Sequence, residues 1–331
     1  MSEPEPTGDD GLLTVVIALA ANTLVAAAKT TAAVLTGSAS MVAEAAHSWA
    51  DTGNELFLLA AERRGGRPAD AGHPRGHGRE TYVWSMFAAV GLLVAGGALS
   101  VWHGVTQLTT GAEEASKFTV NWVVLATAFV FEGISFTQAA RQAHGRGKRF
   151  GLRPLRFVFE TSDATLRAVF LEDLAALAGL LIAGLGIGLH QVTGSSVWDA
   201  LGAIAVGLLL GAVAIVLIMR NHDFLVGETI PISMWNETLS RLLDHPEIDR
   251  VTYLHIEYVG PMRFFVVAAV DLVGDEQESS VAVRLRDLEA EIERLEPVAD
   301  AVLTLSTPDE RSLDRPASAT SSGRKGAPGK T

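Results

Sequence analysis

Long apolar stretches separated by short polar segments fill the first two-thirds of the sequence. A helix needs about 20 predominantly apolar residues to cross roughly 30 Å of hydrocarbon, and several stretches reach that length. They lie near residues 11–36, 40–62, 81–104, 119–142, 164–189 and 199–219. The pattern therefore predicts a bundle of six membrane-spanning helices.

The last third of the chain contains shorter periodic segments. Residues 233–243 and 281–295 have apolar positions at helical spacing, whereas 251–259, 262–273 and 301–306 have the pattern of strands. The order helix, strand, strand, helix, strand predicts a small sheet with helices on one face. This is a ferredoxin-like arrangement.

These patterns divide the chain into four parts. We expect an acidic N-terminal segment at 1–10, a six-span transmembrane domain at 11–219, a ferredoxin-like domain at 220–308 and a disordered tail at 309–331. The tail is expected to be disordered because it is rich in Pro, Ser, Gly and Lys. The predicted fold class is an all-α six-helix transmembrane bundle followed by a small α+β ferredoxin-like cytoplasmic domain.

Basic residues concentrate in two of the predicted loops. Segment 63–79 contains five arginines and segment 141–156 contains six basic residues, whereas the alternate loops are short or acidic. Because basic loops face the cytoplasm, we expect both termini to be cytoplasmic. A composition rich in Ala and Arg, without a transit peptide, favours a bacterial inner (cell) membrane.

Composition excludes several classes of protein. The sequence contains no cysteine, so disulfide scaffolds and thiolate metal sites are excluded. A net charge of −12 argues against nucleic acid as a partner. An intramembrane metal hydrolase needs a general base beside an open metal position, and the sequence has no HExxH-type motif. We therefore do not expect an enzyme.

Two of the predicted spans each carry a pair of ionisable residues at mid-span. His47 and Asp51 are four residues apart and so share one helix face, and Glu172 and Asp173 precede a long apolar run. A charge at the bilayer centre costs about 2.5–3.5 kcal/mol on insertion scales. A bound cation would compensate this cost. The alternative for His47 and Asp51 is a hydrogen-bonded pair that joins neighbouring helices.

The six predicted spans, the segments HSWADTGNE at 47–55 and FLEDLAALAG at 170–179, and the ferredoxin-like domain together resemble the cation diffusion facilitator family. These segments, with VGETI at 226–230, look most like the branch that includes a mitochondrial zinc transporter of animals. The resemblance implies a homodimer in the lipid bilayer that exports a divalent metal ion, usually zinc, in exchange for protons. The metal is then cargo, and no resident cofactor is expected.

The resemblance also implies a transport site with two ligands from the second span and two from the fifth. His47 and Asp51 match the first pair, and Asp173 matches the aspartate of the fifth span. Val169 stands where the family more often has a histidine. Glu172 is a candidate replacement, yet it lies about 100° around the helix from Asp173, where it could instead face a neighbour or hold a proton.

The fourth ligand therefore stays open, with Asn54 and Glu132 as further candidates. Lys29 is excluded as a ligand because an ammonium has no lone pair, and it could pair with Glu132 or with another helix. Imidazole and carboxylate ligands suit tetrahedral zinc and also accept Mn, Fe or Co. Metal and protons compete for the same side chains, and His47 is the expected proton carrier because its ordinary pKa lies near neutrality.

Asp70, His73 and His77 follow the second span at a spacing that resembles a loop metal site of the family. Two imidazoles and one carboxylate could bind zinc. The alternative is a solvated glycine-rich loop that packs under the spans.

The C-terminal domain is expected to be a dimerisation platform without a binuclear zinc site. His255 lies on the first predicted strand, but the other two strands contain no histidine. His245 precedes Pro246 at a helix end, where a capping role is expected. The missing histidines also favour a second hypothesis, a non-transporting membrane scaffold or sensor that binds metal and signals through this domain.

Overall fold

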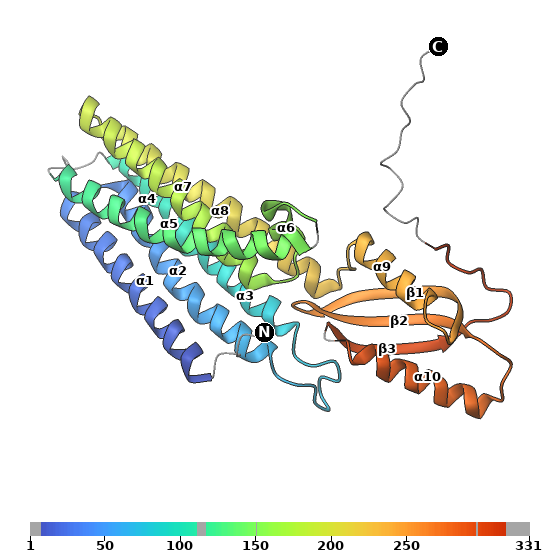
Figure 1. Ribbon diagram of the computed structural model, residues 1–331. Helices are drawn as coiled ribbons and strands as arrows, with labels where there is room; N and C mark the ends of the chain where they lie inside the picture. Colours follow the sequence, from blue (N-terminus) through green and yellow to red (C-terminus); the bar gives the residue numbers. More distant parts are fainter. Residues whose placement is uncertain (1–7, 111–116, 150, 296, 316–331) are drawn as a thin grey trace, which may run out of the picture. The chain divides into compact units, whose positions relative to one another are not determined.

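The computed structural model describes residues 8–110, 117–149, 151–295 and 297–315. The chain forms two compact units that meet between Val226 and Gly227. The first unit consists of long helices, and the second combines helices with a three-stranded sheet (Figure 1). The predicted fold class, a six-helix bundle followed by a small α+β domain, is confirmed.

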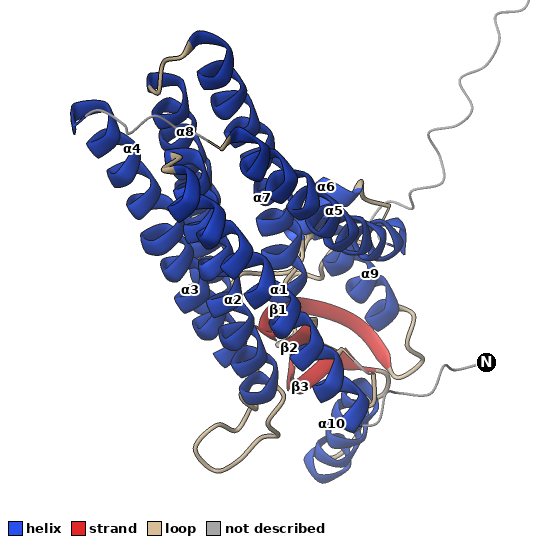
Figure 2. Cartoon of the chain, turned by 90° about the vertical axis from the view of Figure 1, so that its left-hand side faces the viewer, coloured by secondary structure: helices blue, strands red, loops and turns tan. Residues whose placement is uncertain are grey.

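The helices of the first unit run side by side (Figures 1 and 2). They are α1 Gly8–Thr36, α2 Ala39–Gly65, α3 Glu80–Gly91, η1 Leu92–Ala98, α4 Leu99–Thr110, α5 Phe118–Arg149, α6 Pro154–Glu160, α7 Ala164–Thr193 and α8 Val197–Val226. The segments α3, the π-helical η1 and α4 follow one another without a break and form one long helix. Each of the six predicted spans lies inside one long helix, whereas the short α6 was not predicted.

Four of the described helices are long and apolar enough to cross a membrane, namely Glu80–Thr110, Phe118–Lys148, Ala164–Thr193 and Val197–Val226. The helices α1 and α2 have similar lengths, 29 and 27 residues, and contact each other. The second of these is less apolar because it carries several buried polar and charged residues.

The outer surface of the first unit is apolar. Large side chains on all six of the long helices are more than half exposed, among them Leu24, Leu56, Trp102, Val130, Leu185 and Leu208. In water such a surface would aggregate or bind a partner, whereas hydrocarbon solvates it.

The interior of the bundle is packed with small residues around α2, which contacts α1, α3, α7 and α8. Ala39, Ala43 and Ala50 of α2 belong to the buried core. Between η1 and α8, a Cβ added at Gly207 would lie 2.8 Å from the carbonyl oxygen of Gly97. The two backbones therefore touch, as small residues allow in membrane bundles.

The second unit contains α9 Ile232–Leu243, β1 Ile248–Gly260, β2 Arg263–Leu272, α10 Glu278–Glu293 and β3 Val298–Leu305. The sheet order is β1-β2-β3, with an antiparallel β1–β2 pair and a parallel β2–β3 pair. The predicted order of helices and strands is confirmed.

Two expected boundaries differ from the structure. The last membrane helix continues past residue 219 to Val226, because the Arg167 guanidinium donates to Asn221 Oδ1 at 2.7 Å and lies 5.1 Å from the Phe224 ring centroid. These contacts hold its final turns inside the bundle.

Residues 309–315, the first part of the expected disordered tail, have a defined place in the structure. Residues 309–315 lie along β1, where Leu313 N donates to Val251 O at 2.8 Å and Arg250 Nη1 donates to Glu310 O at 2.6 Å. The backbone hydrogen bond at the strand edge and the arginine side chain place this segment. Residues 316–331 of the predicted tail, and residues 1–7 of the predicted N-terminal segment, lie outside the described residues.

Candidate metal transport site

His47 and Asp51 lie on one face of α2, as their spacing predicts. His47 Nδ1 is 3.4 Å from Asp51 Oδ1, and the exposed fractions of the two side chains are 0% and 19%. Neither ring nitrogen of His47, nor Asp51 Oδ1, makes a hydrogen bond to any described residue. Buried polar atoms normally have a partner. The pair therefore does not join helices by hydrogen bonds, and its free lone pairs suit a cation.

A cavity of about 460 Å³ lies beside Asp51, between α1, α2, α5 and α7. Carboxylates from three of these helices line it, namely Asp51, Glu55, Glu132, Glu172 and Asp173. So many carboxylates in one partly enclosed space would repel one another without compensating positive charge. The cavity is therefore suited to a cation.

Glu172 and Asp173 both line this cavity although they are consecutive residues of α7. Asn54 Nδ2 on α2 donates to Glu172 Oε1 at 2.8 Å, and Ser135 Oγ on α5 donates to Asp173 Oδ2 at 2.7 Å. Helix α7 contacts both α2 and α5. Because the two residues are about 100° apart around α7, Glu172 faces α2 and Asp173 faces α5. Val169 also lines the cavity, so the position where the family more often has a histidine faces the same space.

Sequence reasoning missed several polar residues at this cavity, among them Glu55 and Ser135. Glu55 accepts a hydrogen bond from Asn22 Nδ2 at 2.6 Å, and Ser135 orients Asp173 as described above. Glu55 lies one turn after Asp51, so helical spacing could have identified it. Ser135 lies one turn after Glu132, but a serine in an apolar helix is a weak signal without a known neighbour.

Lys29 is paired with Glu44 rather than with Glu132. Its Nζ lies 3.0 Å from Glu44 Oε2, and both side chains are fully buried. Glu44 stands three residues before His47, and was not identified from the sequence as a partner. Glu132 lines the cavity instead.

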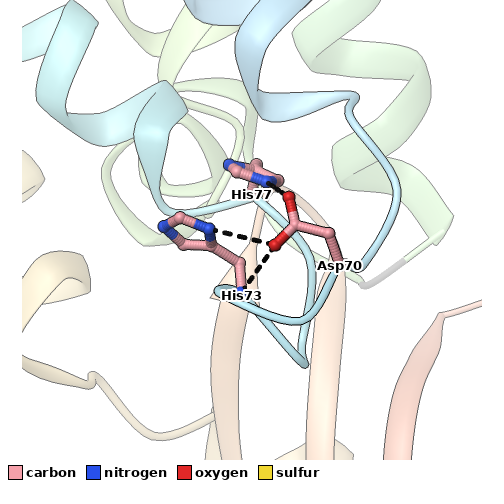
Figure 3. Close-up of side chains that lie close together, drawn as sticks. All are labelled: Asp70, His73 and His77. Atoms are coloured by element: carbon pink, nitrogen blue, oxygen red, sulfur yellow. Dashed lines mark hydrogen bonds and ion pairs between the residues drawn. The ribbon is translucent and has the colours of Figure 1, made fainter.

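Asp70, His73 and His77 come together in the loop after α2 (Figure 3). Their potential ligand atoms all lie within 4.8 Å of one another, which distinguishes this trio among the described residues. The four candidate ligands inside the bundle form no such compact cluster. Asp70 Oδ1 accepts hydrogen bonds from the backbone amides of Gly72 and His73, both at 2.8 Å, and these bonds shape the loop.

The ring of His77 lies between two carboxylates. Its Nε2 is 2.9 Å from Asp70 Oδ2, and its Nδ1 is 2.8 Å from Glu80 Oε1. The hydrogen bond from His77 holds the pKa of Asp70 below its usual range, helped by the backbone amides of His73 and Gly72. Asp70 and then Glu80 raise the pKa of His77. The trio is thus close enough to bind a metal, and ion pairing also stabilises it without one.

The two histidines of the second unit each face one glutamate. His245 Nε2 lies 3.6 Å from Glu291 Oε2, and His255 Nε2 lies 3.5 Å from Glu257 Oε2. His245 Nδ1 also accepts a hydrogen bond from Glu247 N at 3.3 Å, in keeping with its expected place at a helix end. That the domain lacks a binuclear zinc site stays a prediction.

Comparison with known proteins identifies the family. Residues 15–226, more than half of the chain, match the cation efflux transmembrane domain. The mitochondrial proton-coupled zinc antiporter SLC30A9 of Xenopus laevis is 32% identical over 260 residues, which cover 78% of this chain and 46% of that protein. Metal tolerance protein C4 of Arabidopsis thaliana is 32% identical over 234 residues, covering 71% of this chain and 51% of the relative.

A shorter match is to the magnetosome protein MamM of Magnetospirillum gryphiswaldense, which is 32% identical over 119 residues and 36% of each chain. The chain spans about half the length of the first two relatives. The domain match covers the six long helices, apart from the first residues of α1, and the cavity between α1, α2, α5 and α7. The chain therefore belongs to the cation diffusion facilitator family, in the branch that includes the mitochondrial zinc transporters of animals.

Proposed function

We propose that this protein is a secondary active transporter that exports a divalent metal cation, with Zn²⁺ as the first candidate, in exchange for protons. The observation that carries the proposal is the pairing of buried, unbonded ligand atoms on His47 and Asp51 with an adjacent carboxylate-lined cavity. The names of the relatives, a proton-coupled zinc antiporter and a metal tolerance protein, support the same assignment.

The metal binds between α2 and α7 in this proposal. His47 and Asp51 supply ligands from α2, and Asp173 supplies one from α7. Glu172 is the proposed fourth ligand, because its hydrogen bond to Asn54 places its carboxylate beside α2. Nitrogen and carboxylate ligands of this kind bind zinc in tetrahedral geometry.

Exchange follows from the chemistry of these ligands. Metal binding needs neutral imidazole and ionised carboxylates, so each bound metal displaces protons. Rocking of the helices carries the loaded site to the other side of the membrane, where protons replace the metal. An inward proton gradient then drives metal outward.

The topology and the assembly belong to the same proposal. The arginines of segment 63–79 support a cytoplasmic location for the loop after α2, and with it cytoplasmic termini and a bacterial inner membrane. Asp70, His73 and His77 form a second metal site on that side. The second unit serves as the platform of a homodimer.

Zinc flux into proteoliposomes under an imposed pH gradient tests the proposal. Asp51→Asn and Asp173→Asn keep the shape of each side chain and remove its charge, so both should abolish gradient-driven uptake. Glu62→Gln is the matched control, since Glu62 is an exposed carboxylate on the same helix α2. Uptake that persists in both cavity variants would exclude this ligand set.

A metal-binding scaffold is the second candidate function. It is favoured by Val169, which presents an apolar side chain to the cavity where the family more often has an imidazole. A scaffold would bind zinc in a manner that depends on Asp51, yet it would show no flux in the same vesicles.

A further inference from the structure

Lys29 on α1 and Glu44 on α2 form an ion pair inside the bundle. Lys29 Nζ lies 3.0 Å from Glu44 Oε2, and both side chains are fully buried. Glu44 precedes His47 by three residues and shares its helix face. The second carboxylate oxygen, Glu44 Oε1, makes no hydrogen bond within the described part of the chain. The pair thus forms the layer next to the proposed ligands without belonging to them.

The cavity lies mainly on one side of the proposed ligands along the bundle. On α2 its lining residues fall within segment 48–58, and on α7 they are Val169, Glu172 and Asp173. Because α2 ends and α7 begins at the same end of the bundle (Figure 1), both groups lie on the side of the loop that follows α2. The cavity therefore lies on the side of the proposed ligands that is nearer the loop after α2.

The opposite side of the ligands is tightly packed. A Cβ added at Gly179 of α7 would lie 2.9 Å from Glu44 Oε1, so this carboxylate touches the backbone of α7. One turn farther along α2, Ser40 Oγ lies 2.6 Å from the position of a Cβ at Gly202 of α8. Helices α2, α7 and α8 are thus in contact on this side, and the ion pair with Lys29 is the layer closest to the ligands.

We propose that the Lys29–Glu44 ion pair is the barrier that closes the release side of the transport site. The inference rests on the proposed function, because a release side exists only in a transporter. The tethered ammonium of Lys29 repels a divalent cation, and it occupies the carboxylate that the cation would meet next after His47. Metal can leave in this direction only after the pair separates.

An ion pair is suited to this role because it has two distinct states. While paired, the two charges compensate each other in a dry interior, whereas either charge alone is costly there. The barrier therefore stays closed until α1 and α2 separate and new partners reach both groups. This arrangement is a two-state element of the kind that alternating access requires.

The absence of cysteine from the sequence allows a direct test of this barrier. Ala183 of α7 is fully buried and lies one turn beyond Gly179, away from the cavity. We would introduce Ala183→Cys and treat intact cells and inverted vesicles with a membrane-impermeant methanethiosulfonate. This cysteine would report access from each side of the membrane. It would be combined with the double variant Lys29→Met/Glu44→Gln, called the neutral pair, and separately with the control Thr31→Ala on the exposed face of α1.

The expected result is that the cysteine is unreactive in the otherwise unchanged protein and in the Thr31 control. In the neutral pair it becomes reactive from outside the cell, and zinc flux in vesicles loses its dependence on the pH gradient. If the neutral-pair variant folds, its cysteine stays unreactive and its zinc flux still depends on the pH gradient, the ion pair is not the barrier. Labelling of the cysteine needs no zinc and can be measured even in a protein that shows no zinc flux. Absence of flux would contradict the proposed function, whereas the labelling result would still test the barrier.

Gly179→Ala is the second variant, and it serves if the neutral pair does not fold. It keeps both charges but presses a methyl group against Glu44 Oε1, which should weaken the closed state. We expect reaction of the cysteine from outside in this variant as well. An unreactive cysteine here would count against the barrier.

Discussion

Asn54 on α2 donates a hydrogen bond to Glu172 on α7 across 2.8 Å, and both side chains are buried. This bond joins the two helices that supply the proposed ligands. It also explains how a glutamate on a different helix face from Asp173 reaches the same cavity. The amide of Asn54 does not titrate, so its donor is present whether or not Glu172 carries a proton.

Asn54→Ala should therefore weaken metal binding without abolishing it. The variant frees Glu172 Oε1 from its donor, and loss of a partner that orients a ligand reduces metal affinity by about tenfold or more. Titration of the purified protein with zinc measures the effect. Thr137→Ala, which alters an exposed hydroxyl of α5 bonded only within its own helix, should change nothing.

Val169→His should strengthen zinc binding. Val169 lines the cavity and lies one turn before Asp173, so an imidazole there completes a nitrogen and carboxylate set with His47 and Asp51. Zinc affinity should be measured in the Val169→His protein and in the Val169→His/Glu172→Gln protein. If Glu172 is the natural fourth ligand, its removal should cost less affinity once the histidine is present.

Single and double neutralisation of the buried ion pair should differ in stability. Glu44→Gln alone leaves Lys29 as an unpaired buried charge, and breaking a buried pair in this way costs about 3–5 kcal/mol. Lys29→Met/Glu44→Gln removes both charges of the pair, so neither is left unpaired, and it should cost less than either single change. Thermal unfolding in detergent provides the ranking.

An exposed ion pair gives the control for that ranking. Arg241 and Glu237 on α9 are 67% and 63% exposed, so Glu237→Gln should cost less than about 1 kcal/mol. A double variant of the buried pair that is less stable than both singles would show that each residue has essential contacts of its own.

Zinc binding at the loop should strengthen as pH rises. Asp70 and Glu80 raise the pKa of His77, so its proton persists to a higher pH than in a free histidine. Metal binding needs the neutral ring. Zinc should therefore bind the loop weakly below the raised pKa of His77 and more tightly above it. Zinc titrations at several pH values, in the protein with Asp51→Asn and Asp173→Asn, isolate the loop.

His77→Ala should remove most of the loop affinity and the part of the pH dependence that comes from the raised pKa of His77, while His73→Ala should lower the affinity and leave His77 to titrate. Binding at the loop that does not change between pH 6 and pH 8, roughly the range over which histidine titrates, would contradict the role of His77. It would point instead to a site formed by carboxylates alone.

Local patterns were sufficient for most of the fold. The long apolar stretches placed the six long helices because the length of an apolar run is a property of the sequence itself. Alternation and turn residues placed β1 and β2 for a similar reason. The short α6 was missed, since a single helical turn or two leaves little periodic signal, and the end of α8 was missed because contacts with Arg167 extend it.

The sequence by itself determined that His47 and Asp51 share a helix face and that Asp70, His73 and His77 are close along one loop. Both relationships depend only on short separations along the chain. Tertiary structure alone decided that Glu172 meets Asn54, that Ser135 holds Asp173 and that Lys29 pairs with Glu44. These contacts depend on which helices are neighbours and how each is rotated, and packing of the whole bundle sets both.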